Sequence, residues 1–186
     1  MNNTISTKIK NTPININVDT TTYAEAVKLI KEHNLPLTGA DFSNLHLVGV
    51  DFSGTDISGV DFSNSLLEEC IFTNCDMQES CFAETVIENC TFLDSDLAKA
   101  NFVEAICRNS VFGNCRFEKT DLSFSGFWEC DFRCSIFSGA DIFETAFVAC
   151  PVASADFRQA VNTHNAVFGN VIEALMPDDF IPAIAR

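Results

Sequence analysis

The sequence predicts an all-β protein built as a four-sided solenoid, and three observations support this fold class. A large apolar residue returns at every fifth position from Phe42 to Phe157 without a slip, so that all 24 positions are apolar and 14 are Phe. Two residues before each stands a small side chain, which is Ala, Ser, Thr or Cys at 21 of the 24 positions. The other positions of each pentad are mostly polar, with turn-prone Asn and Gly among them.

A period of five fits neither an α-helix nor a flat strand, whose side chains repeat every 3.6 and 2 residues. It fits a chain that turns a corner every five residues and points one large and one small side chain inward on each side. Four sides close a coil of 20 residues, so residues 40–159 give six coils. Coils stacked about 4.8 Å apart form a column roughly 29 Å tall, whose core becomes continuous only through stacking.

Residues 1–39 precede the repeats and predict a polar arm followed by a capping helix. The segment TTYAEAVKLIKEHNL, residues 21–35, places Tyr23, Ala26, Val27 and Ile30 on one helical face and is ended by Pro36. We expect this helix to cover the first coil, because an open coil end is an exposed sheet edge. The alternative is a helix that binds a partner.

The pentads ADFSN, VDFSG, VDFSN, ANFVE, TDLSF, ADIFE and ADFRQ give the repeat a recognisable form. Residues 40–159 resemble the pentapeptide-repeat family, whose consensus is A-(D/N)-(L/F)-x-x. The resemblance implies a right-handed quadrilateral β-helix. It also implies a class of function, because antibiotic-resistance members of the family are DNA mimics that bind type II topoisomerases.

Residues 160–186 follow the last regular pentad and predict a final strand and a short helix from about Asp178. In quinolone-resistance relatives the C-terminal segment forms a two-fold dimer, so the resemblance implies a homodimer through this tail. Simple capping of the column end is the alternative, and the two roles are compatible.

Charge is the strongest compositional signal. The chain has 26 acidic and 11 basic residues, a net charge of -15, which argues against nucleic-acid binding and favours a basic partner or solubility. No Lys or Arg lies between Lys31 and Lys99, whereas twelve Asp or Glu lie from Asp41 to Asp96. No apolar run is long enough to span a membrane, and we expect a cytoplasmic protein.

Two outward faces of the column carry ladders of Asp, because residues 20 apart stack on one face. We predict that these ladders bind a partner: Asp41, Asp61, Asp121 and Asp141 on the first face, and Asp56, Asp76 and Asp96 on the fourth. The alternative is a local role in which each Asp bonds to turn backbone.

Apolar side chains also point outward. Leu66, Val86 and Ile106 stack on the second face, and an exposed apolar stripe needs a cover or a partner. The aromatic residues Phe124, Trp128 and Phe143 also predict partner contacts, because Trp is favoured in binding hot spots.

Conventional catalytic and metal sites are not predicted. Seven of the nine Cys occupy inward positions, where Cys acts as a compact hydrophobic residue, and only Cys81 and Cys134 point outward. No metal-ligand spacing, catalytic motif or cofactor motif is found, and a core filled with Phe has no room for a substrate.

The sequence therefore supports two alternative hypotheses for the function. The first is a DNA mimic whose Asp ladders dock on the basic DNA-binding surface of DNA gyrase or topoisomerase IV, modulating the enzyme or protecting it from inhibitors. The second is a scaffold or bacterial effector that binds another protein through its apolar surface. The fold alone does not choose between them.

Overall fold

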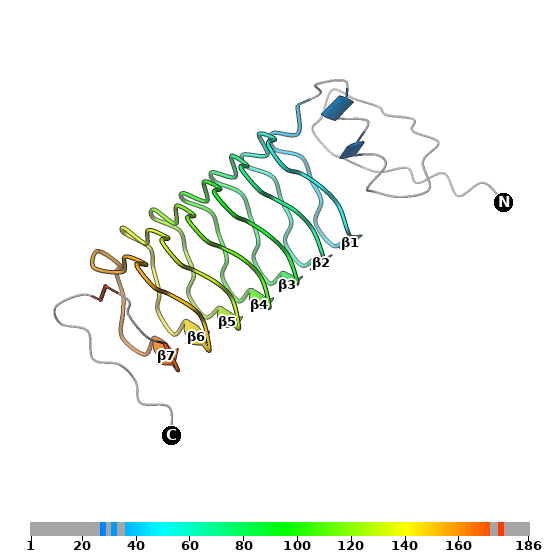
Figure 1. The fold of residues 1–186 in the computed structure, drawn as a ribbon. Helices are drawn as coiled ribbons and strands as arrows, with labels where there is room; N and C mark the ends of the chain where they lie inside the picture. The colour runs from blue at the N-terminus through cyan, green and yellow to red at the C-terminus, as the bar shows by residue number, and fades with distance from the viewer. Residues whose placement is uncertain (1–26, 29–30, 33–35, 172–174, 177–186) are drawn as a thin grey trace.

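The structure is a computed structural model, and it describes residues 27–28, 31–32, 36–171 and 175–176. The chain winds into a stack of coils with one short strand per coil, so that the strands form a single row along the column (Figure 1). These strands make one parallel sheet in sequence order, and they are β1 (His46–Val48), β2 (Leu66–Glu68), β3 (Val86–Glu88), β4 (Ile106–Arg108), β5 (Gly126–Trp128), β6 (Ala146–Val148) and β7 (Val167–Gly169). No helix in the described part is long and apolar enough to cross a membrane.

The pairing register confirms the four-sided solenoid. From β1 to β6, each strand residue pairs with the residue 20 positions later, as His46 does with Leu66. The other three faces are joined by single bridges with the same offset, such as Asp41 with Asp61, Asp51 with Ile71 and Asp56 with Asp76. Each coil therefore contains four pentads, as the sequence predicts.

Stacked phenylalanine rings form the core. Phe92 illustrates the arrangement, because its centroid lies 4.6 Å from those of both Phe72 and Phe112, with the rings nearly parallel. A second column, which includes Phe82 and Phe102, meets the first edge to face. Stacked and edge-to-face ring contacts add stabilisation beyond that from the burial of apolar area.

The phenylalanine columns change faces along the axis. Up to Phe112 they occupy the first and third faces, and the other two faces contribute Leu, Ile, Met or Cys. Beyond it, new columns begin at Phe117 and Phe127 on the fourth and second faces, with Phe117 and Phe137 stacked at 4.8 Å. The third-face column continues to Phe132, which stacks on Phe112 at 5.1 Å, so the fourth and fifth coils each contain three inward Phe and the other coils contain two.

The small inward residues satisfy the polar backbone. The Thr85 hydroxyl donates to the Phe62 carbonyl at 2.8 Å, and the Ser65 hydroxyl does the same to Phe42 at 2.8 Å. In the described part, no buried side-chain nitrogen or oxygen lacks a hydrogen-bond partner. Serine and threonine are therefore tolerated in this apolar interior.

Every corner of the coil has the same unusual backbone. The second residue after each large inward one has a positive φ from Asn44 to Ser154, although many of these residues are neither Gly nor Asn. Glu84, with φ 56°, is an exposed example. A side chain with a Cβ is disfavoured in this left-handed region by about 1–2 kcal/mol.

Replacing Glu84 by Asn should therefore stabilise the protein by about 0.5–1 kcal/mol, because Asn tolerates the left-handed conformation better than Glu. The midpoint of chemical denaturation measures the effect. Glu84→Ala is the matched control, since it removes the same charge without favouring this conformation. Equal midpoints for the two variants would show that corner strain does not limit stability.

The coils continue to pair beyond residue 159, but the offset between paired residues increases from 20 to 21. Val161 pairs with Asp141, 20 positions earlier, whereas Phe168 pairs with Phe147, 21 positions earlier. Asn162, with φ 51°, lies between these two registers, which identifies it as a bulge. The predicted final strand is β7, and the helix predicted from Asp178 lies outside the described residues.

Only part of the predicted N-terminal helix is described. Residues 27–28 and 31–32 have helical backbone, Val27 is 1% exposed within the core, and the Lys31 ammonium donates to the Asp51 carbonyl at 3.3 Å. These contacts fit a helix that packs on the first coils. The arm of residues 1–19 lies outside the described residues.

Candidate functional site

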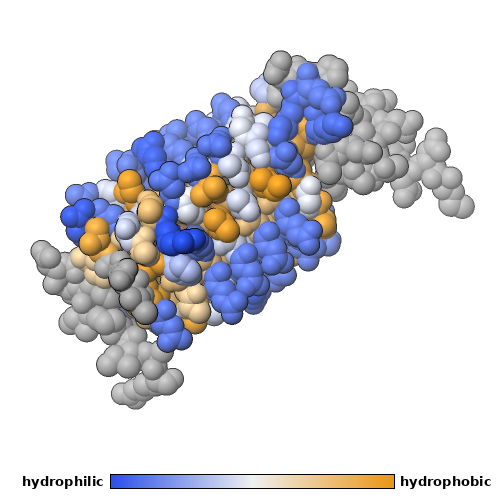
Figure 2. All heavy atoms as spheres, in the orientation of Figure 1, coloured by the Kyte–Doolittle hydropathy of each residue, from blue (hydrophilic) through white to orange (hydrophobic). Residues whose placement is uncertain are grey.

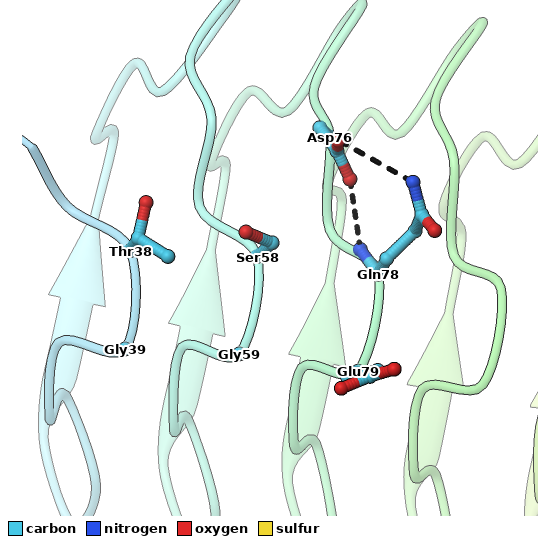
Figure 3. A pocket seen from close by; sticks show the side chains of 7 residues that line it. All are labelled: Thr38, Gly39, Ser58, Gly59, Asp76, Gln78 and Glu79. Atoms are coloured by element: carbon cyan, nitrogen blue, oxygen red, sulfur yellow. Dashed lines mark hydrogen bonds between the residues drawn. The ribbon is translucent and has the colours of Figure 1, made fainter.

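The outward Asp residues have a local structural role. The Asp56 carboxylate accepts the Ser58 amide at 3.0 Å and the Ser58 hydroxyl at 2.7 Å. Asp76 accepts the Gln78 amide in the same way, at 3.1 Å, and Figure 3 shows the Gln78 side chain turned toward this carboxylate. This arrangement, predicted as the alternative to partner binding, is an Asx turn, and it recurs at other corners that begin with Asp or Asn.

The bonds to Asp56 favour its charged form. The Ser58 hydroxyl, the Ser58 amide and the Thr38 hydroxyl together lower the pKa of Asp56 below its usual value, against a smaller effect of burial. Any stability from these bonds is present above the pKa of an unfolded Asp and is lost as pH falls through the lower folded pKa. One carboxylate oxygen serves the turn, so the structural role and a partner role are compatible.

Some of the outward acidic residues form ion pairs and others do not. Asp96 binds Arg116 at 2.8 Å, and Asp51, Glu79 and Glu88 also have a Lys or Arg partner. Asp56, Asp61 and Asp76 have none within the part of the chain that the structure describes. Asp56, Asp61 and Asp76 all lie in the N-terminal half of the column, where the chain has no Lys or Arg between Lys31 and Lys99, and we call residues 41–96 the acidic half.

The ladder members Asp121 and Asp141 lie in a different electrostatic setting. Both accept a turn amide at 3.0 Å, and Asp141 also accepts the Asn162 amide group at 2.6 Å. The C-terminal half carries Arg and Lys side chains, among them Arg133 and Arg158, each paired with an Asp two residues earlier. Asp121 and Asp141 thus share the ladder but lie outside the acidic half.

An open notch lies beside the acidic ladder. It measures about 360 Å³ and is lined by Thr38, Gly39, Ser58, Gly59, Asp76, Gln78 and Glu79 (Figure 3). Gly39 and Gly59 lack side chains at the corner where Glu79 continues the stack, which leaves space in front of the backbone. A partner side chain can approach Asp76 through this space.

The predicted apolar stripe exists, but it is less exposed than expected. Leu66, Val86 and Ile106 are register neighbours in β2, β3 and β4, and each is half-buried. Each of these side chains is partly covered by its neighbour in the next coil, and the sequence pattern of single residues does not show this effect. On the side of the column seen in Figure 2, hydrophobic residues form patches along the axis, with hydrophilic residues on both sides.

The aromatic residues Phe124, Trp128 and Phe143 lie toward the C-terminal end. Phe124 is 50% exposed, and its ring meets Phe143 edge to face with centroids 5.2 Å apart. Trp128 lies across Gly126, where an added Cβ would be only 2.1 Å from the indole. Phe124 and Trp128 both line an open groove of about 600 Å³, which we call the aromatic groove.

Sequence reasoning missed five residues of the aromatic groove: Glu104, Ser125, Gly126, Glu144 and Ala146. A signal for Gly126 was present, because residues two apart on a strand share a face and a Gly beside a Trp leaves room for the indole. Glu104 and Glu144 lie 20 residues before and after Phe124, so the coil period alone places them on the same corner.

The two outward thiols and seven inward thiols are placed as predicted. Cys134 is exposed and Cys81 is half-buried, whereas the other seven are buried, and all nine are free. In the described residues, no cluster of His, Cys, Asp or Glu has the arrangement of a metal site. The expectation that the protein has no catalytic site and no cofactor stays a prediction.

Comparison with known proteins decides the family. The sequence model of the pentapeptide repeat region matches residues 33–102 and 65–132, which together span more than half of the chain. The chain belongs to the pentapeptide-repeat family. The family resemblance seen in the sequence is thereby confirmed.

The comparison with solved structures finds other pentapeptide repeat proteins. HetL of Nostoc sp. strain PCC 7120, involved in heterocyst differentiation regulation, is 13% identical over 82% of this chain and 80% of its own, with a TM-score of 0.41. Rfr23 of Cyanothece 51142 is 13% identical over 77% and 98%, with a TM-score of 0.40. Full-length QnrB1, a plasmid-mediated fluoroquinolone resistance protein, is 18% identical over 72% and 79%, with a TM-score of 0.35. The comparison with curated proteins gives no match.

Proposed function

We propose that this pentapeptide repeat protein is a non-enzymatic interaction module that binds a basic protein surface through its acidic half. The family resemblance directs the choice of partner to a type II topoisomerase, either DNA gyrase or topoisomerase IV. In this proposal the acidic half takes the place of DNA on the enzyme and modulates the enzyme or protects it from inhibitors.

The density of uncompensated charge is the observation that carries the proposal. From Asp51 to Asp96 the chain has eleven Asp or Glu, and four of them pair with Lys or Arg in the described structure, which leaves seven. One of the seven, Glu68, contacts His46, which is a cation only when protonated. These residues span a little more than two coils, about 11 Å at the usual strand spacing. One negative charge per roughly 1.6 Å is close to the value of about 1.7 Å for duplex DNA.

A gyrase supercoiling assay, with and without a quinolone, tests this function. Asp56→Asn, Asp61→Asn and Asp76→Asn together should abolish any effect of the wild-type protein, because they remove three unpaired charges while the amide oxygen still accepts the turn bond. The matched control is Asp121→Asn with Asp141→Asn, which neutralises ladder positions outside the acidic half and should retain the effect.

Two results would contradict the proposal. One is a wild-type protein that does not bind gyrase at low salt, where contacts between exposed charges are strongest. The other is a triple variant that keeps the full effect on supercoiling.

A scaffold role with another protein partner is the second candidate, and the aromatic groove favours it. An exposed Phe and a partly exposed Trp on one wall of a solenoid are typical of contact surfaces. A homodimer through the C-terminal tail also stays a proposal, since residues 177–186 lie outside the described structure. Light scattering of the purified chain measures its mass.

A further inference from the structure

The floor of the aromatic groove changes from a large to small side chains along the column. Ile106, Gly126 and Ala146 are register neighbours in β4, β5 and β6, and they continue the stripe that begins with Leu66. The change from Ile to Gly and Ala lowers the wall of the column at this level. The small residues make room for the Trp128 indole over Gly126 and for the groove beside it.

Trp128 is fixed at one side of this floor. Its indole occupies the space above Gly126, and the Arg108 guanidinium lies 5.4 Å from the ring centroid. Arg108 is itself held by Glu88 at 3.2 Å. The indole thus has neighbours from two coils, and it is still 36% exposed.

Phe124 borders the groove in a strained conformation. It has φ 60°, although a bulky residue is disfavoured in the left-handed region. Along the same corner the chain has Asn44, Asn64, Glu84, Glu104 and Glu144, so the aromatic ring interrupts a polar series. Its half-exposed ring makes an edge contact with Phe143, whose ring lies 4.8 Å from that of His164. Every corner of the coil shares this positive φ, so the distinctive feature of Phe124 is a bulky, exposed aromatic side chain at a position that is polar in the other coils.

Carboxylates stand on both sides of Phe124. Glu104 precedes it and Glu144 follows it on the corner, and both are exposed and line the groove. Glu144 accepts the Asn165 amide group at 3.4 Å, and neither carboxylate has a Lys or Arg partner among the described residues. An apolar floor, two aromatic rings and two unpaired carboxylates therefore meet at one place.

We infer that the aromatic groove binds an arginine or lysine side chain of a protein partner. The aliphatic stem lies on the floor between Phe124 and Trp128, and the cationic head group reaches Glu104 or Glu144. Arg108 already lies over the Trp128 ring, so the partner cation is favoured by the exposed Phe124 ring and by the carboxylate beside it. This inference shares with the proposed function only the premise that the partner is a basic protein.

The only Trp of the chain makes the test specific, because all indole emission comes from Trp128. A tetra-arginine peptide titrated at low salt should change this emission, and a tetra-glutamate peptide should not. Phe124→Asn should weaken tetra-arginine binding about tenfold or more. It should not lower the melting temperature, because relief of the left-handed strain offsets the lost contact with Phe143.

A second pair of variants separates the groove from the general acidic field. Glu104→Gln with Glu144→Gln should weaken binding several-fold, whereas Asp56→Asn with Asp76→Asn removes the same number of charges far from the groove and should change it little. Unchanged Trp128 emission with tetra-arginine, or equal losses for the two double variants, would overturn the inference. If gyrase does not bind but tetra-arginine binds at the groove, the topoisomerase proposal falls and this inference stands.

Discussion

Phe92→Asp should abolish cooperative folding of the column. Phe92 is fully buried, and its ring stacks on Phe72 and Phe112 at 4.6 Å on either side. Removing such a ring costs about 3–5 kcal/mol, and a buried carboxylate without a partner adds several more, against a total stability of about 5–15 kcal/mol for a domain. Circular-dichroism melts and size-exclusion chromatography measure the loss.

The matched control changes a residue of the same pentad that points outward. Asp94 is exposed at a corner with φ 59° and accepts the Asn114 amide group at 2.7 Å. Asn at this position keeps the backbone preference and a hydrogen-bonding oxygen, so Asp94→Asn should melt like the wild type. Two variants that both melt cooperatively near the wild-type temperature would show that the inward phase is wrong.

The nine cysteines should react with a thiol reagent at clearly different rates. At neutral pH we expect rapid reaction of Cys134, slower reaction of Cys81 and protection of the other seven until the protein unfolds. Burial raises the pKa of Cys115 and Cys130 to about 12 and that of Cys150 to about 11. A pKa that is three units higher lowers the fraction of thiolate, the reactive form, about a thousandfold at neutral pH. Burial also keeps the reagent away from the sulfur atom.

Counting the reactive thiols with a chromogenic disulfide reagent, before and after adding guanidinium chloride, measures this protection. Cys134→Ser should remove the fast phase and leave the slow phases and the stability unchanged. Because Cys115, Cys130 and Cys150 remain protonated well above neutral pH, raising the pH to about 9 should not make these three thiols reactive. Three or more fast thiols in the native protein would contradict the inward placement of Cys.

The pentad phase made most of the fold predictable. A period of five determines which side chains point inward. The sequence alone therefore predicts the burial of Phe92, of Cys107 and of the small residues. The one-residue bulge at Asn162 could not be predicted. A left-handed Asn can serve either as a regular corner or as an inserted residue, and only pairing with Asp141 and Phe147 distinguishes the two.

The candidate surfaces were predictable only in part. The coil period places Asp56, Asp61 and Asp76 on two faces, but side chains that reach across coils decide which charges remain unpaired. Arg116 reaches Asp96 across one coil, for example, and Lys99 reaches Glu79. The position of Trp128 over Gly126 likewise depends on the direction of one side chain, and the repeat does not specify this direction.

Competition with DNA for gyrase tests the central claim most directly. Gyrase is first bound to a fluorescent DNA duplex, and the protein is then added while fluorescence anisotropy is followed at two salt concentrations. We predict that the wild-type protein displaces the duplex, that displacement weakens at the higher salt concentration, and that the variant with Asn at positions 56, 61 and 76 does not displace it. Simultaneous binding of the duplex and the protein to gyrase would contradict the claim that the acidic half takes the place of DNA.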